Sequence, residues 1–174
     1  MRGVNLLRQG YSEKQEKQVI HLLGVICTDH HLTIRSSYSA ELLAGVHGFE
    51  DAYPLLVTLN EIYHGVLPQG MNTPRHEANL RYRAILTTDA ESMYKSLTSR
   101  EQKTPAEHTL LGHVSMLREM LRIGLLQKVQ WCDTKDMTAD GHTKGSVDRT
   151  LLKQVMEGQQ EFEYDIQSYT SHPT

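Results

Sequence analysis

The chain has 174 residues, of which 39% are hydrophobic and 22% charged, a composition typical of one globular domain and too apolar for a disordered chain. A net charge of −3 excludes a basic coat for nucleic acid, though not a local basic strip. No apolar run approaches the roughly 20 residues of a membrane span, and the N-terminus is too polar for a signal peptide. With two cysteines and no disulfide framework, we expect an intracellular protein, cytoplasmic or nuclear and not secreted, with no membrane partner.

The first part of the chain predicts β structure. Short apolar stretches at residues 3–7, 19–23 and 32–34 are typical of strands. A polar loop is expected over residues 8–17, and a turn over residues 28–31.

A long helix is predicted next. Serines at positions 36 and 37 offer N-cap oxygens, and apolar residues then recur in steps of three and four from Leu42 to Tyr63. Pro54 is expected to kink or split this helix, and Gly65 is expected to end it. Residues 66–80 contain two prolines and a glycine and are expected to form a loop.

The second half of the chain alternates between predicted strands and predicted helices. A strand at 82–88, ended by Asp89, precedes a short helix at 90–97. A capping box at 104–107 predicts the start of a helix that buries its apolar face and ends at Gly124. A strand at 129–132 and a helix at 147–155 are predicted after it. Helices between strands predict an α/β domain over residues 1–157, with a mixed β-sheet flanked by helices. Residues 158–174 are expected to be a polar, poorly ordered tail.

Three carboxylates stand where a strand passes into the next element, namely Glu41, Asp89 and Asp140. Side chains at the carboxyl ends of neighbouring strands converge at one edge of a sheet. A carboxylate cluster suits Mg²⁺ or Mn²⁺, which prefer oxygen ligands.

Each carboxylate also has a plain structural explanation. Glu41, in a first helical turn, could serve the helix dipole. Asp89 could cap the helix that starts at residue 90, and Asp140 could be an ordinary loop acid. Only their joint appearance favours a shared site.

The three segments together resemble the ribonuclease H domain of copia-type retrotransposon polyproteins. Residues 35–44, R-S-S-Y-S-A-E-L-L-A, resemble the family's stretch around its Glu, and Leu86-Thr87-Thr88-Asp89 is similar to the strand that carries its second Asp. Residues 131–145, W-C-D-T-K-D-M-T-A-D-G-H-T-K-G, are similar to the family's terminal W-x-D-T-x-x-x-x-A-D-x-L-T-K. The resemblance covers nearly the whole chain.

The resemblance implies a ribonuclease H-like fold and an endonuclease that hydrolyses the RNA strand of RNA–DNA hybrids. Glu41, Asp89 and Asp140 would be the catalytic residues and ligands of two Mg²⁺ or Mn²⁺ ions, one activating water and one stabilising the leaving oxygen. The implied partners are the hybrid and an upstream reverse transcriptase domain of the same polyprotein.

Two departures from the family pattern matter. The family's first catalytic Asp lies in a first strand that we expect to be missing here, since residues 1–7 resemble the family's second strand. His142 replaces the usual Leu and is either an accessory group near the leaving oxygen or a partly exposed side chain.

The missing ligand leaves open whether the domain is an enzyme. The alternative is an inactive ribonuclease H-like remnant, or a non-catalytic module that tethers nucleic acid or a polymerase. Arg118 and Arg122, spaced four residues apart on a predicted helix, could contact phosphates, although a solvated helix face is the commoner explanation.

Overall fold

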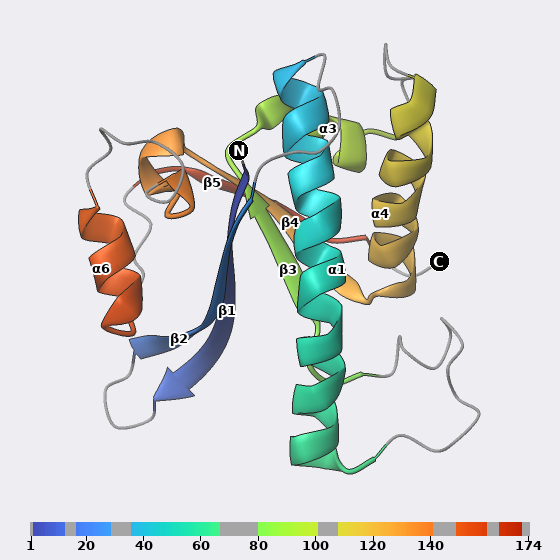
Figure 1. The fold of residues 1–174 in the computed structure, drawn as a ribbon. Coiled ribbons are helices and arrows are strands. Elements are labelled where there is room, and N and C mark those ends of the chain that lie inside the picture. The colour runs from blue at the N-terminus through green and yellow to red at the C-terminus, as the bar shows by residue number, and fades with distance from the viewer. Residues whose placement is uncertain are drawn as a thin grey trace. The chain divides into compact units, whose positions relative to one another are not determined.

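The computed structural model describes residues 2–12, 17–28, 36–66, 80–100, 108–140, 149–159 and 164–171. Its elements form a mixed α/β fold (Figure 1), as the alternation of strands and helices predicted. The chain divides into two compact units, one made of residues 1–35 and 132–166, the other of residues 36–131 and 167–174.

The first unit contains a long antiparallel hairpin, β1 (Arg2–Ser12) and β2 (Lys17–Thr28), with a register shift between Leu6 and Leu7. Residues 8–12 and 17 belong to the strands, so the predicted polar loop was wrong there. The ladder extends through polar residues because its hydrogen bonds join backbone groups, whatever the side chains. The predicted strand at 32–34 lies outside the described residues.

Shorter elements complete this unit. The 3₁₀ turn η2 (Thr134–Asp136) is capped by Asp133, whose carboxylate accepts a hydrogen bond from the Lys135 amide (2.9 Å). Helix α6 (Thr150–Met156) packs against β2 and buries Val155, which confirms the last predicted helix over this range.

The second unit begins with α1 (Ser37–His64), an unbroken helix of 28 residues. Ser36 caps it as predicted, because its hydroxyl oxygen accepts from the Ser39 amide (3.1 Å). Pro54 lies inside the helix and does not split it. Gly65 ends it at φ +89°, a conformation that glycine adopts without steric cost.

The rest of this unit forms a sheet and the helices around it. Its elements are β3 (Ala84–Thr88), α3 (Glu91–Thr98), η1 (His108–Leu110), α4 (Leu111–Ile123), β4 (Leu126–Cys132) and β5 (Ile166–Tyr169). The strand order is β3-β4-β5, with β3 and β4 parallel (Figure 1). The end residues Cys132 and Ile166 are grouped with the first unit.

The core of the second unit lies between α1, α3, α4 and the sheet. The apolar face predicted for the helix before Gly124 is confirmed, since Leu110, Val114, Leu117 and Leu121 are all buried. Gly124 ends α4 in the left-handed conformation, φ +80°. The capping box at 104–107 lies outside the described residues.

Strand β5 forms within the stretch that the sequence predicted to be a polar tail. All four of its residues are exposed, so no buried apolar pattern marks the strand in the sequence. Its position beside β4 provides the hydrogen bonding that local sequence does not indicate. None of the helices in the described ranges is long and apolar enough to cross a membrane.

Candidate functional site

Glu41 is the fifth residue of α1 and is half-buried. The prediction that it lies in the first turn was wrong, because the helix begins at Ser37 and its first turn has no acidic residue. The dipole of a helix acts mainly within its first and last turns. The dipole therefore gives a weaker explanation for this carboxylate than the sequence suggested.

Helix α1 runs antiparallel to β3. Near the end of the helix, the Asn60 side-chain oxygen accepts from the amides of Arg81 (2.8 Å) and Tyr82 (3.0 Å), just before the strand begins. Nearer the start of the helix, a Cβ on Gly45 would lie 3.7 Å from Leu86 in the middle of the strand. The N-terminal end of α1 therefore lies toward the carboxyl end of β3 (Figure 1).

Glu41 and Asp89 consequently lie at the same end of the second unit. Glu41 is one turn before Gly45, and Asp89 directly follows β3. The first turn of α1 also contacts the helix after Asp89, since the Tyr38 hydroxyl donates to Ser96 Oγ (3.2 Å). Two carboxylates from distant parts of the sequence are brought to one end of the sheet.

Asp89 joins β3 to α3 and is half-buried. Its backbone carbonyl accepts from the Trp131 indole on the neighbouring strand (2.9 Å). The interpretation of Asp89 as a helix cap was wrong, because the N-cap position is Ala90, whose amide donates to Thr88 Oγ1 (3.1 Å). Among the described residues, the Asp89 carboxylate takes part in no hydrogen bond or ion pair.

Asp140 belongs to the first unit, where the segment before it is anchored at two points. The Asn5 side-chain amide on β1 donates to Thr138 Oγ1 (2.9 Å), and Thr138 is buried. Buried Asp136 accepts from the Tyr164 amide (2.9 Å). The Asp140 amide donates to the Met137 carbonyl (3.3 Å).

These anchors were not predicted from the sequence. Asn5 is a polar residue in an otherwise apolar stretch, and Thr138 belongs to the terminal motif. A polar residue within an apolar strand is a usable signal, because a buried amide needs a hydrogen-bond partner. Its partner, 133 positions away along the chain, could not be read from the sequence.

The predicted metal ligands have carboxylate oxygens, the donors that Mg²⁺ prefers. Within the ranges that the structure describes, no three or more His, Cys, Asp or Glu side chains gather into a group that could hold a metal ion. Glu41 and Asp89 share an end of one unit, and the place of Asp140 in a common site stays a prediction. His142 lies outside the described residues.

Comparison of the chain with protein-family models, with curated proteins and with solved structures finds no match. The motifs and the geometry of the described residues are therefore the basis on which a function is proposed.

Proposed function

We propose that this chain is a retroelement ribonuclease H-like domain that hydrolyses the RNA strand of RNA–DNA hybrids in a metal-dependent reaction. The observation that carries the proposal is the placement of Glu41 and Asp89 at one end of the second unit, where α1 packs antiparallel to β3. An arrangement of carboxylates beyond the carboxyl end of a parallel strand is typical of α/β active sites.

In this proposal, Glu41, Asp89 and Asp140 hold Mg²⁺ or Mn²⁺. The bound ions would supply an activated water and charge stabilisation for the leaving oxygen. The half-buried Asp89 carboxylate, without a hydrogen-bond donor among the described residues, is available as a ligand. The anchors at Asn5 and Asp136 hold the segment before Asp140 in a defined conformation.

The family resemblance implies that the proposed substrate is an RNA–DNA hybrid, recognised by its RNA strand. The 2′-hydroxyl groups of the RNA strand distinguish a hybrid from DNA. The proposed partner within the polyprotein is an upstream reverse transcriptase domain, which would generate the hybrid.

The decisive assay is cleavage of a labelled RNA–DNA hybrid with Mg²⁺. We expect Asp89→Asn and Glu41→Gln each to lower the cleavage rate by at least 100-fold. Two exposed acids of α1 provide matched controls, and Asp51→Asn and Glu50→Gln should leave the rate unchanged. Cleavage by the wild type that is equally insensitive to all four substitutions would contradict the proposal.

A non-catalytic hybrid-binding module is the second candidate. It is favoured by one observation, namely that β1 and β2 carry no Asp, whereas the family resemblance requires a further Asp on a strand before Glu41. Loss of a ligand weakens metal binding. Hybrid binding by the wild type without any cleavage would identify this function.

A further inference from the structure

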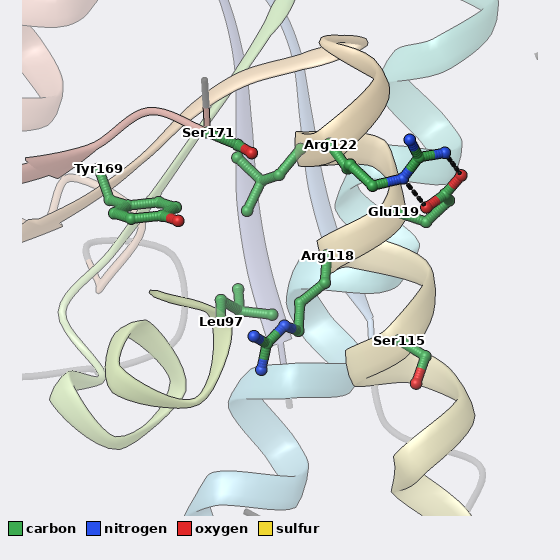
Figure 2. A pocket seen from close by; sticks show the side chains of 8 residues that line it. Leu97, Ser115, Arg118, Glu119, Arg122, Tyr169 and Ser171 are labelled. Atoms are coloured by element: carbon green, nitrogen blue, oxygen red, sulfur yellow. Dashed lines mark hydrogen bonds and ion pairs between the residues drawn. The ribbon is translucent and has the colours of Figure 1, made fainter. Parts of the chain in front are cut away.

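A polar pocket lies on the face of α4 in the second unit (Figure 2). Its volume is about 300 Å³, and it is lined by side chains from α3, α4 and the C-terminal segment, including Leu97, Ser115, Arg118, Arg122, Tyr169 and Ser171. This volume is at the lower end of small-molecule sites, the size of a compact ligand rather than of a large cofactor. None of the three predicted metal ligands lines it.

Arg118 is held in a fixed orientation at this pocket. Its Nη2 donates to the Ser99 carbonyl (2.6 Å) and its Nη1 to the Ser96 carbonyl (3.4 Å), both at the C-terminal end of α3. A guanidinium has five N–H donors, so these two bonds leave others for a ligand. Because the half-buried side chain is already ordered, an anion bound here would cost little conformational entropy.

Arg122 adds a second guanidinium one turn further along α4. Its Nε and Nη2 donate to the two carboxylate oxygens of Glu119 (2.7 and 2.6 Å), and Figure 2 shows these two side chains turned toward each other. Two guanidiniums and one carboxylate give the pocket a net positive charge. A positively charged pocket with fixed N–H donors favours phosphate, which accepts hydrogen bonds from guanidinium in a forked geometry.

The C-terminal segment contributes an aromatic ring to the pocket. Tyr169 ends β5, with its side chain among the pocket residues, and Ser171 follows with a hydroxyl (Figure 2). An aromatic ring beside cationic groups is the usual combination for binding a nucleotide, because the base stacks on the ring while the phosphate meets the cations.

We propose that this pocket binds a nucleotide unit, with Arg118 contacting its phosphate and Tyr169 stacking on its base. The nucleotide is either free in solution or one residue of a single-stranded nucleic acid, and both present the same phosphate and base. The proposal goes beyond the hybrid-cleaving function and does not depend on it, since it uses none of the carboxylates.

The test follows side-chain and amide NMR signals of the whole chain during titration with AMP, with inorganic phosphate and with a six-residue oligoadenylate. We expect saturable shifts at Arg118 and Tyr169 with AMP and with the oligomer, and AMP should bind at least tenfold more tightly than phosphate. Tighter binding of the oligomer than of AMP identifies a strand as the source, and equal binding identifies a free nucleotide.

Two pairs of variants make the test specific. Tyr169→Leu should weaken AMP binding at least tenfold, whereas Tyr169→Phe, which keeps the ring, should not. Arg118→Gln should weaken it at least tenfold, whereas Arg81→Gln, at an exposed position before β3, should not. Absence of saturable shifts in the wild type would overturn the proposal. AMP binding that is unaffected by Tyr169→Leu would also overturn it, and because Tyr169 lies on an exposed strand, this variant is informative even if Arg118→Gln fails to fold.

Discussion

Asn60 shows how much a single side chain can contribute to the geometry of the proposed site. It is 3% exposed, and its amide nitrogen donates to the carbonyls of Leu56 (2.9 Å) and Tyr82 (3.2 Å). Its oxygen accepts from the amides of Arg81 and Tyr82. One residue thus joins the end of α1 to the start of β3 and helps set the antiparallel packing that brings Glu41 and Asp89 to the same end.

We expect Asn60→Ala to lower the free energy of unfolding by about 1–3 kcal/mol, because it leaves buried backbone groups without partners. Urea denaturation measures this change. Thr58→Ala removes an exposed bond within the same helix, from Thr58 Oγ1 to the Pro54 carbonyl, and should cost less than about 0.5 kcal/mol. Equal effects of the two substitutions would contradict the role given to Asn60.

The hydrogen bond between Asn5 and Thr138 can be tested in the same way. Thr138→Val keeps the shape and removes the hydroxyl, whereas Thr138→Ser keeps the hydroxyl. A double-mutant cycle of Thr138→Val with Asn5→Ala, followed by urea denaturation, should give a coupling energy of about 0.5–1.5 kcal/mol. In the Thr138→Ser background, Asn5→Ala should cost as much stability as it does in the wild type. In the Thr138→Val background, it should cost less. A coupling near zero would mean that this bond does not hold the segment before Asp140.

The pair of Glu119 and Arg122 sets a pH dependence. The hydrogen bond from Arg122, helped by its charge, lowers the pKa of the Glu119 carboxyl below its usual value. A lowered pKa means that the pair stabilises the folded chain fully above the usual glutamate pKa and loses this effect as the pH falls through the lowered pKa. The size of the effect is small because both groups are solvent-exposed.

We therefore expect Arg122→Gln to raise the pKa of Glu119 toward the ordinary glutamate value. A ¹³C NMR titration of the side-chain carboxyl measures it directly. Arg81→Gln serves as the control and should leave the Glu119 titration where it is in the wild type. An unchanged titration in Arg122→Gln would show that the two side chains are not paired in solution.

At the scale of elements, the packing of α1 on β3 and α3 depends on a glycine. A Cβ on Gly45 would collide with the terminal methyl of Met93, a side chain that is only 1% exposed. Alanine is favoured over glycine inside a helix by about 1 kcal/mol, but overpacking a core typically costs about 1–3 kcal/mol. The colliding atom is the far end of a flexible methionine side chain, so a shift of Met93 can accommodate the Cβ, and the cost stays near the low end of that range.

We expect Gly45→Ala to stabilise the chain by clearly less than the helix-propensity gain of about 1 kcal/mol, because the shift of Met93 offsets most of that gain. Gly112 in α4 is the matched control, because a Cβ there meets nothing within 4 Å among the described residues, and Gly112→Ala should stabilise by up to about 1 kcal/mol. Thermal denaturation of both variants separates the two effects. Stabilisation by Gly45→Ala as large as that by Gly112→Ala would show that α1 does not lie close to Met93.

The elements that the sequence predicted well carry strong local signals. Ser36 and Gly65 mark the two ends of α1, and the spacing of Leu110, Val114, Leu117 and Leu121 identifies the buried face before Gly124. The strand predictions that were wrong concern elements defined by pairing. Residues 8–12 and 17 of the β1–β2 hairpin are mostly polar, and all residues of β5 are exposed. These segments are strands only because each pairs with a neighbouring strand.

In the molecule as a whole, the local sequence identifies the candidate site residues but not how they are brought together. Glu41 and Asp89 could be selected because each stands beside a strand or helix boundary with a recognisable motif. Their placement at one end could not be deduced, because it depends on the antiparallel packing of α1 on β3 and on contacts such as those of Asn60. The same holds for the anchors of the Asp140 segment, whose partners are far away in the chain.

The proposed function requires Glu41, Asp89 and Asp140 to bind the same divalent cations. Paramagnetic broadening of amide NMR signals by substoichiometric Mn²⁺ tests it most directly, with competition by excess Mg²⁺. We expect selective broadening around all three carboxylates, reversal by Mg²⁺, and loss of broadening at all three positions in Asp89→Asn but not in Asp51→Asn. Broadening confined to one carboxylate, or equal broadening in the two variants, would contradict it.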